Sequence, residues 1–213
     1  FHYAFHPVTR RAFALAADGT LGDVRRIEVR MAMPAPADDD PRWSYELAGG
    51  ALMDLGCYGL HVMRTLGALA VPGVGGPPII TSARATERGA RIDAECDVEV
   101  SFPGGATGVT ANSMIADDFS FTIGITGTRG AALVHDFIRP SRDDRLTVTT
   151  ADGTRVERLG TRSSYAYQLE AFAAHLAAGS ALPIGLDDAV DNMALIDEAY
   201  RAAGLRSEEH TSE

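Results

Sequence analysis

The sequence contains no lysine, because all 19 residues counted as Lys or Arg are arginine. Schiff-base chemistry and the lysine of a phosphate-binding loop are therefore excluded within this chain. Cysteine is almost as scarce, since only Cys57 and Cys96 occur and they form no CxxC pair. This spacing argues against a disulfide scaffold and against a zinc site, and it fits a reducing cytoplasm.

Long hydrophobic runs and positively charged stripes are also missing. Apolar stretches such as 67–74 are interrupted by Gly and Pro, and they are far shorter than the roughly 20 residues of a membrane helix. The formal net charge is -10 and the arginines are scattered, so no surface is indicated that would neutralise nucleic-acid phosphates. The sequence predicts a soluble, cytoplasmic protein that binds neither membranes nor nucleic acid.

The length and composition fit one folded domain. The chain has 213 residues, of which 46% are hydrophobic, enough for a compact domain with a real core. It opens at Phe1, without Met or a signal peptide and inside an apolar segment, so we expect upstream residues that this chain lacks. Residues 206–213 break the preceding helical pattern and resemble a translated sequencing adapter. We expect one domain over 1–205 and a non-native tail over 206–213.

The spacing of apolar residues predicts helices near both ends and strands between them. The expected helices cover 8–17, 51–69, 165–178 and 186–203. The expected strands cover 24–33, 79–86, 95–102, 106–113, 119–126, 131–137, 146–150 and 155–159. Pro103-Gly104-Gly105 and Asp152-Gly153 are typical hairpin turns. We predict an α+β fold with an open, predominantly antiparallel sheet and helices packed on one face.

One predicted helix carries three titratable side chains at helical spacing. Asp54, Tyr58 and His61 stand at i, i+4 and i+7, so a regular α-helix presents them on one otherwise apolar face. Gly56 and Gly59 cost the same helix roughly 1 kcal/mol each relative to Ala. Their presence indicates that a ligand or another backbone approaches this helix closely.

The residues alone leave two interpretations of this face open. It is either a functional surface or a structural one, in which Asp54 satisfies a buried Tyr58 hydroxyl and His61 lies at the helix rim. His2 and His6 have the i, i+4 spacing of a metal pair and could serve a metal-dependent hydrolase. No third ligand is indicated, however, so the structural interpretation of this pair is favoured and we predict no metal site.

A family resemblance adds to this pattern. Residues 49–58 (GGALMDLGCY) resemble the G-G-x-x-x-D-x-G-x-[HY] signature of the Gfo/Idh/MocA oxidoreductases, and specifically the branch with Tyr, which includes glucose-fructose oxidoreductase and dihydrodiol dehydrogenases. Residues 1–7 (FHYAFHP) are similar to the segment that follows the family's E-K-P motif, and 21–24 (LGDV) to its G-x-[IL]-G turn. Residues 165–172 (YAYQLEAF) and 191–197 (DNMALID) resemble its two C-terminal helices.

This resemblance implies an N-terminal Rossmann domain that binds NAD or NADP, followed by the present domain. By position, Asp54 matches the aspartate of the signature and Tyr58 its His or Tyr, and both act with the E-K-P lysine. Hydride removal from an alcohol carbon needs a group that takes the hydroxyl proton, which a tyrosine beside a cation can do. Because the phosphate-binding fingerprint and that lysine are missing, we expect the chain to be inactive alone.

We therefore predict a fragment of an NAD(P)-dependent oxidoreductase that transfers hydride between the nicotinamide and a hydroxyl or carbonyl of a sugar, polyol or dihydrodiol-like substrate. Substrate contacts are expected from His61, Tyr3 and His6, and cofactor contacts from Arg42 and Trp43. We also expect a homo-oligomer formed through the open face of the sheet. The main alternative is a non-catalytic binding or oligomerisation module of the same fold.

Overall fold

The computed structural model describes residues 1–89 and 91–205, and within them eight strands form one sheet. The strands are β1 Val24–Ala32, β2 Ile79–Gly89, β3 Ile92–Ser101, β4 Thr107–Ser113, β5 Ser120–Gly127, β6 Gly130–Val134, β7 Arg145–Thr150 and β8 Gly153–Arg158. The α-helices are α1 Pro7–Ala17, α2 Cys57–Ala68, α3 Ser164–Ala178 and α4 Leu186–Ala202. Short helical turns are η1 His2–Phe5, η2 Pro41–Trp43, η3 Tyr45–Leu47 and the π turn η4 Leu52–Gly56.

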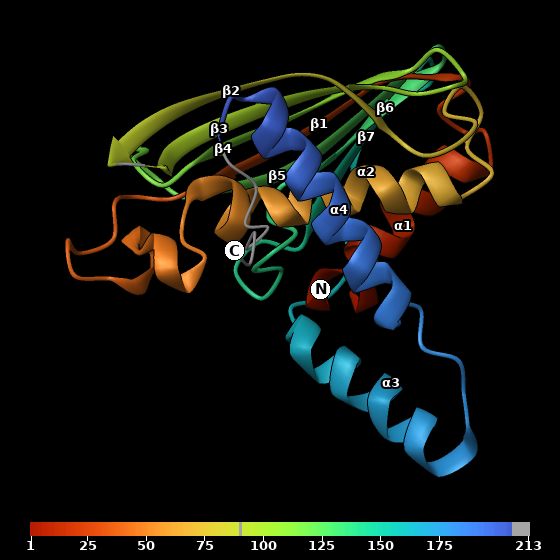
Figure 1. Ribbon diagram of the computed structural model, residues 1–213. Coiled ribbons are helices and arrows are strands. Elements are labelled where there is room, and N and C mark those ends of the chain that lie inside the picture. The colour runs from red at the N-terminus through yellow and green to blue at the C-terminus, as the bar shows by residue number, and fades with distance from the viewer. Residues whose placement is uncertain (90, 206–213) are drawn as a thin grey trace.

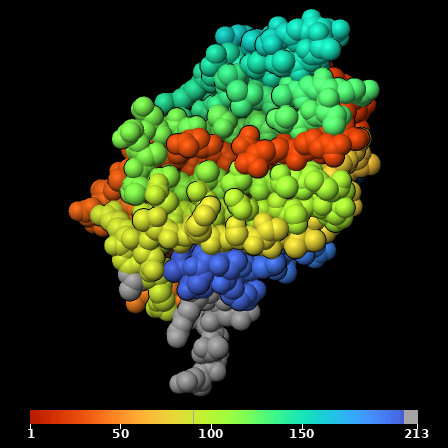
Figure 2. All heavy atoms as spheres, turned by 90° about the horizontal axis from the view of Figure 1, so that it is seen from above, coloured from red at the N-terminus to blue at the C-terminus, as the bar shows by residue number. Residues whose placement is uncertain are grey.

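The sheet is open and mostly antiparallel, as predicted. Its order is β2-β3-β4-β1-β5-β6-β7-β8, and only the central pair of β1 with β4 is parallel. Figure 1 shows the helices on one side of the sheet. In Figure 2 the opposite side is seen, where the strands lie side by side and none of the described helices covers them. The predicted α+β class is therefore confirmed, while the expected tail over 206–213 lies outside the described residues.

Alternating polarity explains why one face of the central strand β1 lies on the core. Ile27, Val29 and Met31 are buried, and Glu28 and Arg30 between them are exposed, the pattern of a strand with one face on a core. The predicted strand bounds agree with the structure to within a few residues. The largest differences are of three residues: β2 ends at Gly89, β3 begins at Ile92, and the strand expected over 131–137 ends at Val134.

The core lies between the sheet and helices α1 and α2. Leu60, Met63 and Leu66 of α2 are fully buried, as are Ile27 and Ile123 of the sheet. Helix α4 packs beside α2 and reaches β2. Across the described ranges, none of the helices combines the length and the hydropathy that a bilayer crossing requires.

Helix α3 is different, because it extends away from the sheet (Figure 1). Ser164, at its first position, is its only buried residue. The helix touches the rest of the chain mainly through η1. It is thus joined to the domain at its start and is open to solvent along its length.

Candidate active site

The segment before α2 is shaped by two consecutive glycines. The N–H of Gly49 donates to the carbonyl of Ser44 at 2.8 Å, and that of Gly50 donates to the carbonyl of Arg42 at 3.0 Å. Gly50 has a φ of 120°, and a Cβ there would lie 2.1 Å from Oδ1 of Asp93. Only glycine fits this conformation and this contact. The pair therefore folds the loop of η2 and η3 back against the start of the helix.

Asp93, which sequence analysis did not select, anchors this start. Its side chain is fully buried, and Oδ2 accepts a 2.6 Å hydrogen bond from the N–H of Leu52 while Oδ1 accepts one from the Tyr200 hydroxyl at 3.2 Å. Burial raises the pKa of the Asp93 carboxyl. One carboxylate thus satisfies a backbone donor at the first helical turn and links it to α4.

The expected regular α-helix from residue 51 is interrupted, and this corrects the prediction. Leu52–Gly56 form a π turn, in which the N–H of Cys57 donates to the carbonyl of Leu52, five residues back. The wider turn shifts the angular positions of the residues before it relative to those after it. The helix therefore departs from the regular 3.6-residue period in the segment that carries Asp54.

The carboxylate of Asp54 bonds a side chain of the loop. Its Oδ2 accepts a 2.8 Å hydrogen bond from Nε of Arg42, whose guanidinium also binds the carboxylate of Asp40. These residues border a hollow of about 390 Å³ that Gly49 and Met53 also line. Arg42 and Asp54 are therefore one charged unit at the edge of this hollow, and within the described residues no hydrogen bond joins Asp54 to Tyr58.

Trp43 lies on the outer side of the same loop. Its indole N–H donates to the carbonyl of Pro36 at 3.4 Å, and the guanidinium of Arg88 stacks 4.2 Å from the ring centroid. The first contact lies within the loop, and the second ties the loop to strand β2. Trp43 directly follows Arg42 in the chain, but its ring packs against the Arg88 guanidinium.

Tyr58 stands in a cluster of rings. The rings of Phe1, Tyr3 and His2 lie 5.1, 6.2 and 6.0 Å from it, measured between centroids. The side chain is half-buried, and among the residues that the structure describes none hydrogen bonds to its hydroxyl. Burial raises the pKa of Tyr58 to about 12, with smaller contributions from Cys57, Tyr165 and Asp54. At neutral pH the hydroxyl therefore keeps its proton and can donate it.

Beneath Tyr58 a buried string of polar groups joins three elements. The hydroxyl of Tyr3 lies 2.6 Å from Nδ1 of His61, and Nε2 of His61 lies 3.1 Å from Oδ2 of Asp188. Asp188 also accepts from Arg64 at 2.9 Å. Burial lowers the pKa of His61 to about 4 against the opposing effect of Asp188, and it raises that of Tyr3 well above its usual value. Neutral His61 then donates from Nε2 and accepts at Nδ1.

His2 and His6 are placed by structural contacts. Nδ1 of His6 accepts from the N–H of Val8 at the start of α1, so its Nε2 is the donor to the carbonyl of Arg162 at 3.1 Å. His2 bonds Ser164 at 2.7 Å and stacks on Tyr165. In residues 1–89 and 91–205, no three His, Cys, Asp or Glu side chains gather into a group that could hold a metal ion.

The structure therefore brings together only part of the predicted set. Tyr58, His61 and Tyr3 meet in the ring cluster, whereas Arg42, Trp43 and Asp54 belong to the loop. His6 lies behind η1 and caps α1. Phe1, whose ring stacks on His61 with centroids 4.1 Å apart, and Asp188 were missed. For Asp188 the available signal was an acidic residue in the first turn of its helix, which indicates a favourable helix dipole and nothing more.

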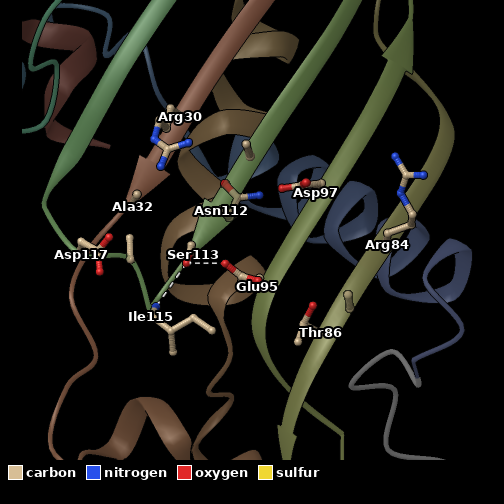
Figure 3. A pocket seen from close by; sticks show the side chains of 13 residues that line it. Arg30, Ala32, Arg84, Thr86, Glu95, Asp97, Asn112, Ser113, Ile115 and Asp117 are labelled. Atoms are coloured by element: carbon tan, nitrogen blue, oxygen red, sulfur yellow. Dashed lines mark hydrogen bonds between the residues drawn. The ribbon is translucent and has the colours of Figure 1, made fainter.

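A second hollow, of about 400 Å³, lies on the open face of the sheet. Figure 3 shows Arg30, Arg84, Glu95 and Asp97 projecting from neighbouring strands, with Ser113 bonded to Glu95. Helices α2 and α4 lie behind the strands in this view. This polar hollow is thus separated by the sheet from Tyr58.

Comparison with known families identifies the family to which this fold belongs. The family model described as the GFO/IDH/MocA C-terminal domain matches residues 9–133. The chain belongs to this family. The family resemblance of the signature segment is therefore confirmed.

Several curated relatives are named as sugar oxidoreductases. D-xylose 1-dehydrogenase (NADP(+)) 2 of Haloferax volcanii is 27% identical over 95% of this chain and 61% of its own length. A dTDP-3,4-didehydro-2,6-dideoxy-alpha-D-glucose 3-reductase of Streptomyces violaceoruber is 29% identical over 73% of this chain and 44% of its own length. The chain thus spans between two fifths and two thirds of the length of these two relatives.

Solved structures share the fold at lower identity. An aldose-aldose oxidoreductase from Caulobacter crescentus, complexed with glycerol, superposes with a TM-score of 0.81 at 21% identity, over 96% of this chain and 60% of its own. A 3-ketoreductase from Actinomadura kijaniata, in complex with NADP and TDP-benzene, superposes with a TM-score of 0.78 at 18% identity, over 96% of this chain and 61% of its own. The open sheet and its helices are therefore an architecture common to all three proteins.

Proposed function

We propose that the chain is the C-terminal, substrate-side domain of an NAD(P)-dependent oxidoreductase acting on a hydroxyl or carbonyl of a sugar or polyol. The observation that carries the proposal is Tyr58. Its half-buried hydroxyl stands among rings, without a hydrogen-bond partner among the described residues, at the signature position of the family. A hydroxyl held in this way can form a hydrogen bond with a bound ligand.

The chemistry assigned to Tyr58 is proton transfer. A bound reduced nicotinamide supplies the hydride that a carbonyl carbon accepts. The Tyr58 hydroxyl then gives its proton to the carbonyl oxygen, which becomes the alcohol. In the reverse direction the phenolate must take the alcohol proton, and a pKa of about 12 makes this difficult until a cation lowers it. The chain has no lysine, and none of the described arginines hydrogen bonds to the Tyr58 hydroxyl, so we propose that the cation is a lysine from another part of the protein.

The surrounding residues have supporting roles in this proposal. His61 and Tyr3 are almost completely buried and form the floor beneath Tyr58, so we propose that they position Tyr58 against the substrate, while the buried His6 caps α1. Asp54 holds Arg42 at the edge of the 390 Å³ hollow. A guanidinium fixed at such an edge can meet a polar cofactor or substrate group.

We further propose that a dinucleotide-binding domain precedes Phe1 in the parent protein, meaning the longer protein of which this chain is a part. The family model is that of a C-terminal domain, and D-xylose 1-dehydrogenase (NADP(+)) 2 extends beyond the matched region by about two fifths of its length. Without that domain the chain is inactive. The open face of the sheet, with its polar side chains, is the proposed surface for homo-oligomerisation.

The coding sequence upstream of Phe1 and an activity assay test the proposal. We expect a strand, a G-x-G-x-x-G turn, a helix and an E-K-P motif before Phe1. The protein encoded by the whole frame should bind NADH or NADPH and oxidise or reduce members of a panel of aldoses, polyols and keto-sugars. A stop codon or an unrelated sequence within about 100 residues upstream contradicts the proposal, because one nucleotide-binding domain needs more than that length.

A further inference from the structure

Helix α3 carries four large apolar side chains on one face. Tyr165, Leu169, Phe172 and Leu176 follow each other at i, i+4, i+7 and i+11 and are 57%, 67%, 50% and 70% exposed. This spacing aligns them along one side of the helix. We call these four residues the α3 stripe.

A helix of this composition needs a partner for this face. Isolated helices of about 15 residues are marginal in water, and most helical stability in proteins comes from packing an apolar face. Contiguous exposed apolar surface of this kind marks an interaction site. The first half of α4 repeats the pattern, since Leu186, Val190 and Met193 are also exposed. The exposed apolar surface of α3 and of the first half of α4 is therefore expected to pack against another part of the parent protein.

The start of the chain lies against the start of this stripe. His2 bonds Ser164 at 2.7 Å, and its ring stacks on Tyr165 with centroids 4.1 Å apart. Figure 1 places the N-terminus beside α3, between this helix and α1. Any residues joined to Phe1 therefore emerge next to Tyr165.

We propose that the α3 stripe is the surface on which the dinucleotide-binding domain of the parent protein sits. This inference rests on the proposed function, which places that domain directly before Phe1. The matched relatives are longer than the aligned region and the family model is that of a C-terminal domain, so a whole domain is available to cover the stripe. Its connection at Phe1 brings it to this face and away from the open side of the sheet.

The position of the stripe also links domain docking to the chemistry. The His2 ring lies between Tyr165, on which it stacks, and Tyr58, whose ring centroid is 6.0 Å away. The stripe therefore runs directly up to the ring cluster. A cofactor-binding domain that packs on α3 brings the cofactor next to the Tyr58 hydroxyl. Weakening this packing misplaces the cofactor without changing the residues that bind it.

Hydrogen exchange on the parent protein tests this inference. The amides of residues 169–178 should be protected at least about tenfold over a free helix, equally at low and high protein concentration. The double variant Leu169→Arg with Phe172→Arg should lose this protection. Its hydride transfer should fall at least about tenfold, because small misplacements are costly, while NADPH or NADH affinity stays within about threefold. Val156→Arg, at a 56% exposed position of edge strand β8, is the matched control and should change none of these.

The possible outcomes separate this inference from the proposed function. Protection that disappears on dilution means that a second copy covers the stripe, and it overturns the inference. Unprotected α3 amides, or a double variant with parental protection and hydride transfer, also overturn it. If α3 is protected and the double variant exposes it, but the parent binds no nicotinamide, the docking surface stands and the proposed function fails.

Discussion

The hydroxyl of Tyr3 lies 2.6 Å from Nδ1 of His61, and both side chains are almost completely inaccessible to water. Because Nε2 of His61 faces the carboxylate of Asp188, the two contacts together favour one tautomer, with the proton on Nε2. The string joins η1, α2 and α4, which are far apart in sequence. It fixes the floor on which Tyr58 and Phe1 rest.

Removing the Tyr3 hydroxyl should destabilise the protein. Tyr3→Phe keeps the ring and leaves Nδ1 of His61 with only its 3.5 Å contact to the Thr65 hydroxyl in a buried space, so we expect the free energy of unfolding to fall by about 1–3 kcal/mol. Tyr167→Phe is the control, since Tyr167 is only half-buried and should change it by less than about 0.5 kcal/mol. Denaturant titration of both variants measures the difference. Equal stability of the two variants contradicts the role given to the Tyr3 hydroxyl.

Stability should also fall in mild acid because of His61. In the folded protein burial holds its pKa near 4, below its ordinary value of 6.5. Between these values the unfolded chain binds a proton that the folded chain does not, so the free energy of unfolding decreases as the pH falls from 6.5 toward 4. One such group contributes a slope of about 1.4 kcal/mol per pH unit at most. Denaturant titrations between pH 7 and pH 4.5 should therefore give a smaller slope for His61→Gln than for the parent.

The sequence pattern predicts the fold well because it depends on local periodicity. Alternation in β1 and the hairpin turn before Gly153 appear in short windows, and helices α3 and α4 end or begin at glycines. Such signals do not depend on distant residues. The confirmed α+β class follows from them.

The site was harder to predict, because its geometry depends on distant partners. The π turn before Cys57 gives no signal in apolar spacing, and neither does the hydrogen bond that joins Asp54 to Arg42. Asp188 meets His61 across 127 residues of sequence. Only the folded chain shows that contact, whereas Tyr58 can be selected as a candidate from a single segment of sequence.

The open face of the sheet should control association. Ala111 lies in central strand β4 and borders the polar hollow of that face, so Ala111→Arg adds bulk and charge to the proposed contact. We expect the parent protein to be an oligomer and this variant to dissociate. Ala151→Arg, in the exposed turn between β7 and β8, should associate like the parent. Light scattering over a range of concentrations measures both, and a variant with parental mass contradicts the proposed surface.

Asp54 and Arg42 should act as one unit in turnover. Their side chains bond each other at 2.8 Å, so losing either partner releases the other. Asp54→Asn and Arg42→Gln should each lower hydride transfer, and the double variant should be no worse than the more affected single variant, because neighbouring residues are non-additive. Single-turnover rates of the parent, the two single variants and the double variant complete a double-mutant cycle. Fully additive losses contradict a shared role.

Tyr58→Phe should abolish most of the activity of the parent protein. The substitution keeps the ring among Phe1, Tyr3 and His2 and removes only the hydroxyl that gives or takes the substrate proton. We expect hydride transfer to fall about 100-fold or more, as losses of general acid-base catalysis do, with cofactor affinity nearly unchanged. His61→Gln, one turn further along α2, should lower the rate less. A purely structural hydroxyl predicts the reverse, a stability loss of about 1 kcal/mol with near-normal turnover. Single-turnover kinetics and denaturation midpoints on folded variants distinguish the two, and a parental rate in Tyr58→Phe excludes Tyr58 as the proton donor.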